Sequence, residues 1–164
     1  MNHFSFPHES PFLSRDRRGE RWAIPYHFEC LNGRIENLLW NQREAIEGQN
    51  ILDIGSHMGT FAYAALEMGA KHVHCIDTDD QLIAQGKELF ELHGAEKSRY
   101  CFETAEAGGF MKQLNEGAYD TILCFGLLYY CPDPLGLIRK MVRVVKQNIL
   151  IDTFTASYAA VQGK

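Results

Sequence analysis

The chain has 164 residues, of which 46% are hydrophobic and 23% are charged, a composition typical of one soluble globular domain. Its formal net charge of −5 excludes the broadly basic surface on which general nucleic-acid binding depends. The 5 cysteines include no CxxC pair, which indicates buried thiols in a reducing compartment and not a disulfide framework.

The N-terminal 20 residues are rich in Pro, Ser and Phe and show neither a hydrophobic period nor the apolar run of a signal peptide. We expect residues 1–33 to form an arm that packs by its aromatic side chains or stays loose, ahead of a domain at 34–164. A run of arginines in the arm is either a solvated face or a contact for an anion such as RNA. These arginines are Arg15, Arg17, Arg18 and Arg21. No apolar stretch is long enough to span a bilayer, so we expect a cytoplasmic location without membrane contact.

From residue 34 onward, hydrophobic residues recur alternately at helical and at strand spacing. Helices are predicted at 34–47, 60–68, 79–92 and 105–115, and from Asp133 through Val145. Strands are predicted at 51–54, 72–76, 99–102, 119–125 and 148–151. This alternation with short connections predicts a doubly wound α/β fold, whose mainly parallel sheet has the order 3-2-1-4-5 and helices on both faces.

The loop after the first predicted strand, Asp53 to Gly59, is the most informative segment of the chain. In open α/β sheets, ligands bind at the carboxyl ends of the strands. Gly55 and Gly59 allow a tight turn and a close approach of the backbone to a ligand. The following helix directs its free N–H groups toward the same place. Together with the Asp53 carboxylate, these amides suit a zwitterion such as the amino-acid end of methionine.

Asp77 ends the second predicted strand, 22 residues after Gly55. An acid in this position accepts hydrogen bonds from the two hydroxyls of a ribose. A ribose and a zwitterion together indicate S-adenosylmethionine (SAM). Two other interpretations stay open. One is an oxidoreductase that binds a nicotinamide dinucleotide, although His57 stands where the GxGxxG fingerprint has its second glycine. The other is a strand–helix turn that holds no ligand.

The segment ILDIGSHMGTFAYAALEMGAKHVHCID (51–77) resembles motif I of the class I SAM-dependent methyltransferases, continued to the acid of their second strand. The segment YDTILCFGLLYYCPDPLGLIRKMVRVVKQNILIDT (119–153) resembles their fourth strand, the helix after it and their fifth strand. It is most similar to the branch with tRNA wobble-uridine-modifying and related small methyltransferases. The resemblance covers residues 51–152 and implies SAM as cofactor, with S-adenosylhomocysteine (SAH) as product.

The resemblance also assigns positions in the cofactor site. Around the methionine moiety and the ribose they are Asp53, Gly55, Ser56, Gly59 and Asp77. Near the adenine they are Thr78, Thr104 and Ala105, and beneath the sulfonium they are Cys124 and Phe125. An aromatic face suits the sulfonium because this cation has no N–H donors.

The acceptor is expected at the mouth of the site, where it contacts Tyr129 and Tyr130. In-line transfer from a sulfonium mainly requires orientation and exclusion of water, so a general base is optional. His27 is the candidate base and lies in the arm near Trp22 and Tyr26. The sequence leaves the acceptor open between a small molecule and RNA. His72 and His74 share a strand face without a third ligand, so no metal is expected.

The chain stops about a dozen residues after the fifth predicted strand, whereas the usual fold of the family adds two further strands there. We therefore expect a minimal or truncated class I fold whose fifth strand is a sheet edge. That edge is expected either to pair across a homodimer or to be covered by the N-terminal arm. The short C-terminal part also leaves a second hypothesis open, a SAM-binding or scaffold protein without catalysis.

Overall fold

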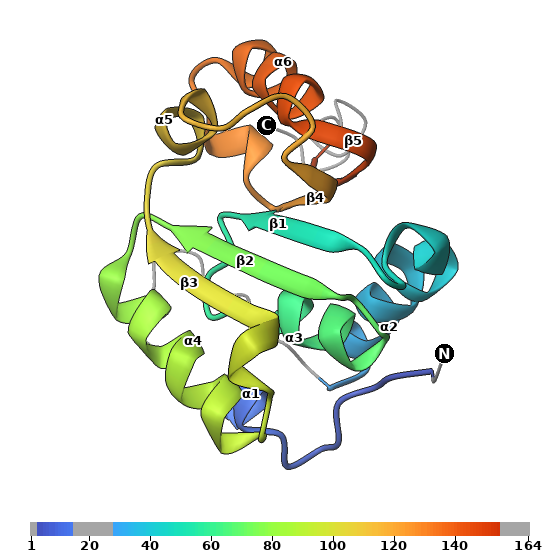
Figure 1. Cartoon of the computed structure of the whole chain (residues 1–164). Helices are drawn as coiled ribbons and strands as arrows, with labels where there is room; N and C mark the ends of the chain where they lie inside the picture. The colour runs from blue at the N-terminus through green and yellow to red at the C-terminus, as the bar shows by residue number, and fades with distance from the viewer. Residues whose placement is uncertain (1–2, 15–27, 155–164) are drawn as a thin grey trace, which may run out of the picture.

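The structure, a computed structural model, describes residues 3–14 and 28–154. In this part of the chain, five strands form one sheet in the order β3-β2-β1-β4-β5, as predicted. The strands are β1 (Asn50–Ile54), β2 (His72–Asp77), β3 (Tyr100–Thr104), β4 (Tyr119–Phe125) and β5 (Val145–Asp152). All neighbouring pairs are parallel, so the carboxyl ends lie along one side of the sheet, to the left in Figure 1.

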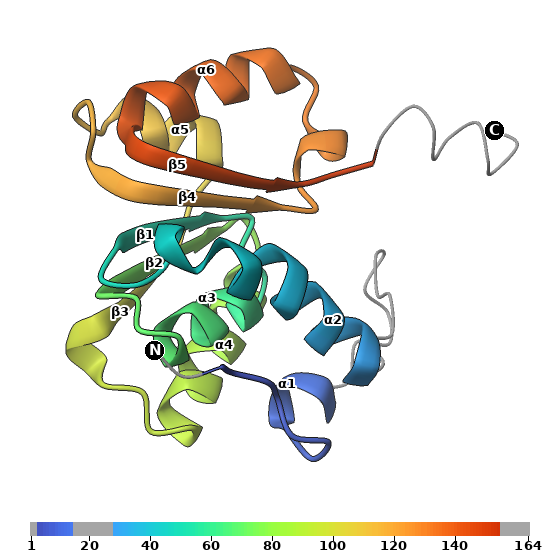
Figure 2. The ribbon, with the colours of Figure 1, turned by 90° about the vertical axis from the view of Figure 1, so that its right-hand side faces the viewer.

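Helices cover both faces of the sheet, which confirms the doubly wound architecture (Figures 1 and 2). One face carries α1 (Pro11–Ser14), α2 (Phe28–Leu38), the 3-10 segment η1 (Trp40–Ala45), α3 (Thr60–Glu67) and α4 (Asp80–Leu92). The other face carries α5 (Ala107–Lys112) and α6 (Pro134–Val144). Two further 3-10 segments are η2 (Lys97–Arg99) and η3 (Leu128–Tyr130).

Each face of the sheet has its own hydrophobic core, because successive side chains of a strand point to opposite faces. In β1, Ile51 packs into the core beneath α3 and α4. Its neighbour Leu52 packs with Met111 and Met141 of α5 and α6. The strands are thus buried on both faces, as the near-continuous apolar runs of the sequence require.

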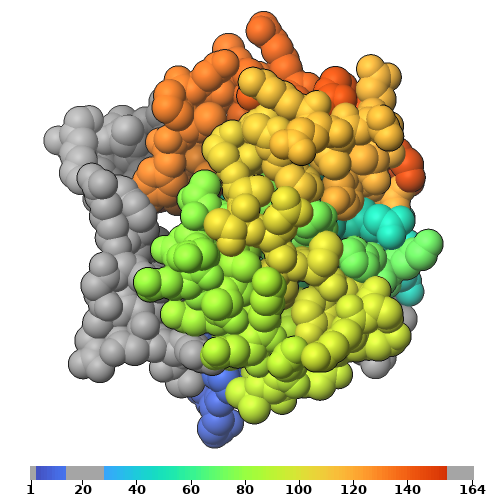
Figure 3. Space-filling model, turned by 60° about the vertical axis from the view of Figure 1, so that its left-hand side comes forward, coloured from blue at the N-terminus to red at the C-terminus, as the bar shows by residue number. Residues whose placement is uncertain are grey.

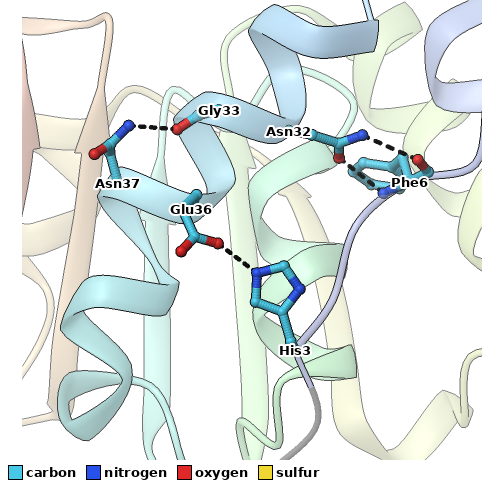
Figure 4. A network of polar contacts seen from close by, with 6 residues as sticks. All are labelled: His3, Phe6, Asn32, Gly33, Glu36 and Asn37. Carbon is cyan, nitrogen blue, oxygen red and sulfur yellow. Dashed lines mark hydrogen bonds and ion pairs between the residues drawn. The ribbon is translucent and has the colours of Figure 1, made fainter.

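The described part of the N-terminal arm packs by its aromatic side chains, one of the two outcomes expected for it. Phe6 and Phe12 are fully buried, and their ring centroids lie 6.0 and 5.0 Å from that of Tyr63 in α3. The Asn32 side chain of α2 accepts a hydrogen bond from the Phe6 amide at 2.8 Å and donates one to its carbonyl at 3.0 Å (Figure 4). Residues 3–14 therefore cover the α2–α3 side of the molecule and not the edge of β5.

The helix predicted at 34–47 is wrong at both ends. α2 spans Phe28–Leu38, and the chain then kinks at Gln42, whose φ and ψ are −116° and 26° within η1. Gly33 lies in the middle of α2 on an open surface. The helix continues through it because the buried residues Leu31 and Ile35 anchor the turns on both sides.

Other boundaries differ from the prediction as well. α5 is shorter than 105–115, because Glu106 caps it by accepting from the amides of Gly108 and Gly109. β3 runs on to Thr104 instead of ending at residue 102. β5 begins at Val145, which was predicted to be helical. Val145 packs against the α5–α6 core, and the apolar pattern cannot distinguish a helix from a strand at such a position.

β5 is the outermost strand in the described part of the sheet. Its Ile151 side chain remains 40% exposed. Pairing of this edge across a homodimer stays a prediction. No helix in residues 3–14 and 28–154 is long and apolar enough to cross a membrane.

Candidate functional site

The loop after β1 winds through three residues with left-handed backbone. Gly55, His57 and Gly59 have φ values of 66°, 54° and 73°. The Ser56 amide donates to the Ile76 carbonyl at 3.0 Å, and the Gly59 amide donates to the Ser56 carbonyl at 2.8 Å. The loop is therefore the predicted tight turn, fixed to the end of β2. Glycine adopts this backbone region most readily, and a residue with a side chain, such as His57, is uncommon there.

The two glycines of this loop face side chains of the protein. A Cβ on Gly59 would stand 2.9 Å from the Phe102 ring and 3.0 Å from the Phe90 ring. A Cβ on Gly55 would stand 3.1 Å from Leu127, which follows β4. Gly59 thus makes room for helix–sheet packing, a role that the sequence analysis missed. A role of either glycine in binding the cofactor stays a prediction.

Asp77 is the best-positioned acid of the site. Its Oδ2 accepts a hydrogen bond from the His57 amide at 2.9 Å, and its Oδ1 accepts one from the Asp79 amide at 3.1 Å. The residue is half-buried. Both oxygens keep lone pairs beyond these two bonds. The carboxylate is therefore held rigidly at the end of β2 with acceptor capacity left for a ligand.

The residues expected near the adenine lie beside Asp77. Thr104 is its register partner at the end of β3, and the Ala105 amide donates to the Asp77 carbonyl at 2.8 Å. Thr78 and Thr104 are exposed, and Ala105 is half-buried. Figure 3 brings forward the side on which the strands end, with the β3–α5 segment in yellow between α4 in green and α6 in orange.

Asp53 is buried beneath the same loop, with 3% of its surface exposed. Burial raises the pKa of its carboxyl to about 8, and the negative charge of Asp77 adds to the effect. Asp53 is therefore mostly neutral at pH 7. Ser56 is buried as well, so neither side chain lies open to solvent as Thr78 does.

The two β4 residues expected beneath the sulfonium point to opposite faces of the sheet. Phe125 lies on the sheet face that α3 and α4 cover, where its ring meets that of Phe61 edge to face at a centroid distance of 5.2 Å. Cys124 is fully buried in the core under α5 and α6. Burial also raises the pKa of its thiol to about 12. Only Phe125 is placed to face a ligand at the loop.

An ion pair that the sequence analysis missed joins α2 to the end of β5. Arg34 Nη2 lies 2.5 Å from Asp152 Oδ2, and the Arg34 guanidinium lies 4.7 Å from the centroid of the Phe61 ring. Asp152 ends a parallel strand, so the rule that ligands bind at strand ends already marked it. No comparable signal in the sequence pointed to Arg34.

Tyr129 and Tyr130 follow β4, next to this ion pair. The Tyr129 ring stacks on Phe154 at 4.5 Å and meets Tyr130 edge to face at 4.3 Å. Burial raises the pKa of the Tyr129 hydroxyl well above its usual range, and the Tyr130 hydrogen bond and the Asp152 charge add to it. Tyr129 therefore stays protonated at neutral pH.

The remaining candidates divide into two groups. His74 lies on the other face of the sheet, where its Nδ1 is 2.7 Å from the Tyr119 hydroxyl and its Nε2 is 3.5 Å from Glu103. The candidate residues of the arm fall outside the described residues: Arg15, Arg17, Arg18, Arg21, Trp22, Tyr26 and His27.

The sheet order, the tight loop after β1 and the acid that ends β2 are features of a Rossmann-like fold. Residues 46–160 match the family described as "Methyltransferase domain", and the chain belongs to this family. The resemblance inferred from the sequence is thereby confirmed.

Three known proteins illustrate the similarity. A tRNA U34 carboxymethyltransferase of Trichodesmium erythraeum is 28% identical over 66% of this chain and 32% of its own length. A ubiquinone biosynthesis O-methyltransferase of Sodalis glossinidius is 31% identical over 76% of this chain and 49% of its own length. The structure of the [4+2]-cyclase SpnF superposes with a TM-score of 0.64 at 20% identity, over 74% of this chain and 43% of that protein. The chain thus spans a third to a half of the curated relatives it matches, and the cyclase likeness shows the fold alone.

Proposed function

We propose that this chain binds SAM at the carboxyl ends of β1 to β4 and transfers its methyl group to an acceptor. The observation that carries the proposal is the Asp77 carboxylate, which the His57 and Asp79 amides hold beside a loop of left-handed residues. SAM is the cofactor implied by the family, and when bound it supplies a methyl group on a sulfonium, which is a good leaving group.

The residues present fit the three parts of this cofactor. Asp77 accepts hydrogen bonds from the ribose hydroxyls, and Thr78, Thr104 and Ala105 border the adenine. Asp53 and the loop amides receive the ammonium and carboxylate of the amino-acid end, and Arg34 provides the cation for that carboxylate. The aromatic faces of Phe61 and Phe125 suit a sulfonium.

On the acceptor side, we propose that Tyr129 and Tyr130 orient the acceptor by contact. A protonated Tyr129 donates a hydrogen bond and does not act as a base. His27 remains the proposed base. The acceptor is a small molecule or an RNA that the arm arginines contact. Of the relatives named above, one is a tRNA U34 carboxymethyltransferase and another is an O-methyltransferase of ubiquinone biosynthesis. A cytoplasmic location and a homodimer through the β5 edge are further proposals.

The alternative is a SAM-binding protein without catalysis. Transfer of a labelled methyl group from SAM to RNA and to phenolic small molecules separates an enzyme from a binding protein. For an RNA acceptor, activity should fall steeply with added salt, because released counterions drive the binding.

Calorimetric titration tests the cofactor itself. We expect SAH to bind with a stoichiometry of about one per chain, as one strand-end site requires, and NADH to show no binding under the same conditions. Tight NADH binding without SAH binding would restore the oxidoreductase interpretation. If neither SAH nor NADH binds, the loop from Asp53 to Gly59 is better interpreted as a strand–helix turn that holds no ligand.

The pH dependence of SAH binding is a second expected result. Affinity should rise by about tenfold per pH unit between pH 6 and 7.5, because the neutral Asp53 must lose its proton to pair with the ligand ammonium. The pKa of about 8 for Asp53 sets this window. Titration in buffers of different ionisation enthalpy measures the proton released on binding.

The matched control is Asp53→Asn, which cannot ionise and should give a flat profile over the same range. A wild-type profile as flat as that of the variant would remove Asp53 from the ligand site. The unfolding temperature of the variant serves as a second check. Because burial raises the pKa of Asp53 from 3.8 to about 8, the wild-type fold loses stability progressively as the pH rises from about 4 to about 8. The stability gained by Asp53→Asn should therefore be largest above pH 8.

A further inference from the structure

The Arg34–Asp152 ion pair lies between the two halves of the proposed site. Arg34 stands over Phe61, the second residue of α3 and thus close to the loop assigned to the amino-acid end of SAM. Asp152 lies on the acceptor side, since Phe154, two residues further along the chain, stacks on the Tyr129 ring at 4.5 Å. The pair therefore touches both the cofactor region and the aromatic surface formed by Tyr129, Tyr130 and Phe154.

The pair is accessible enough to change partners. The side chains of Arg34 and Asp152 are 26% and 37% exposed. A carboxylate that leaves such a position is rehydrated, whereas separating a fully buried pair would leave an uncompensated charge. The Asp152 backbone stays in place in any case, because its carbonyl accepts a hydrogen bond from the Gly126 amide at 2.8 Å.

We propose that Arg34 exchanges Asp152 for the carboxylate of the bound cofactor, and that the exchange turns the Asp152 carboxylate toward the aromatic surface. This inference rests on the proposed function. One guanidinium–carboxylate contact replaces another of the same chemistry, so the exchange involves no net loss of ion pairing. Before SAM binds, Asp152 competes with the cofactor carboxylate for the Arg34 guanidinium. Once SAM is bound, the Asp152 carboxylate is available to accept hydrogen bonds from the acceptor. The order of binding follows, with the cofactor preceding the acceptor.

Two ligands separate this exchange from other effects. SAH carries the amino-acid carboxylate, whereas 5′-methylthioadenosine has the same adenosine and thioether without it. Removing the competitor by Asp152→Asn should tighten SAH about two- to fivefold, the strength of a half-exposed ion pair, and leave methylthioadenosine unchanged. Arg34→Gln should weaken SAH by about 2- to 80-fold, the loss of a charge-assisted hydrogen bond reduced by the Asp152 ion pair that no longer has to be broken, again without effect on methylthioadenosine.

A double variant and a distant control complete the experiment. In the Arg34→Gln background, Asp152→Asn should no longer change the affinity for SAH, because no arginine remains to be released. Glu91→Gln removes the exposed ion pair with Lys97 on α4 and should leave both affinities unchanged. Asp152→Ser repeats the test with a different side chain, and the unfolding temperatures of all variants are recorded.

The outcomes are distinct. If Asp152→Asn and Asp152→Ser weaken SAH or leave it unchanged, Asp152 is not a competitor and the exchange is wrong. If Arg34→Gln lowers the affinities for SAH and for methylthioadenosine equally, Arg34 supports the fold and does not bind the ligand carboxylate. If the wild-type chain binds neither SAH nor methylthioadenosine, the proposed function itself fails.

Discussion

Asp77→Ala is expected to weaken SAH binding by about 1.5–3 kcal/mol, or about 10- to 150-fold, because a charge-assisted hydrogen bond to the ribose is lost. The substitution also removes the acceptor of two backbone amides, those of His57 and Asp79. The loop should therefore lose its anchor as well as its ligand contact. Calorimetry with SAH measures the first effect, and thermal unfolding measures the second.

Asp79→Ala is the control that separates the two effects. The Asp79 side chain caps α4 by accepting from the Gln81 and Leu82 amides, so its loss should lower stability by about 1 kcal/mol. It has no assigned contact with the cofactor. If Asp77→Ala reduces SAH affinity no more than Asp79→Ala does, Asp77 only supports the loop and the ribose assignment is wrong.

Gly59→Ala is expected to destabilise the fold by about 2–5 kcal/mol, the sum of a left-handed alanine and an overpacked contact. Its φ of 73° is unfavourable for alanine, and the new methyl group would stand 2.9 Å from the Phe102 ring. Phe102 and Phe90 are themselves buried in the core, so neither ring can move aside freely. Chemical denaturation of the wild-type protein and of the Gly59→Ala variant measures the difference in their free energies of unfolding.

Gly94→Ala provides the matched comparison. Gly94 has a similar φ of 70°, but nothing lies within 4 Å of the position of its Cβ. Only the backbone penalty of about 1–2 kcal/mol should remain at this site. Equal losses for the two variants would show that packing against Phe102 contributes nothing at Gly59.

The architecture could be predicted because each level of the sequence pointed to the same arrangement. Apolar runs marked strands that are buried on both faces, and Asp133 with Pro134 marked the start of α6, where the Asp133 carboxylate accepts from the Gly136 amide at 2.8 Å. The errors arose where packing overrides local signals. The sequence pattern predicts a helix that starts at Arg34, but burial of Leu31 extends α2 back to Phe28.

The local geometry of the candidate site was predictable where one loop or one strand end supplies it, as in the tight turn at Gly55 and the position of Asp77 at the end of β2. It was not predictable where two distant segments meet. Arg34 and Asp152 are 118 residues apart, and no spacing rule connects an arginine on an early helix with an acid on the last strand. The role of Gly59 was hidden for the same reason, because the Phe102 ring that fills its space comes from β3.

The double hydrogen bond between Asn32 and the backbone of Phe6 gives the N-terminal segment a mechanical role. These two hydrogen bonds attach the N-terminal segment to α2 and restrain the rotation of the helix about its axis. Arg34 is the second residue after Asn32 on that helix. A fragment cut to residues 46–160, the segment that matches the family, would keep the loop and Asp77. It would lose both the Asn32–Phe6 hydrogen bonds and the Arg34 guanidinium. If the proposed function is right, such a fragment should bind methylthioadenosine as the full chain does but bind SAH more weakly.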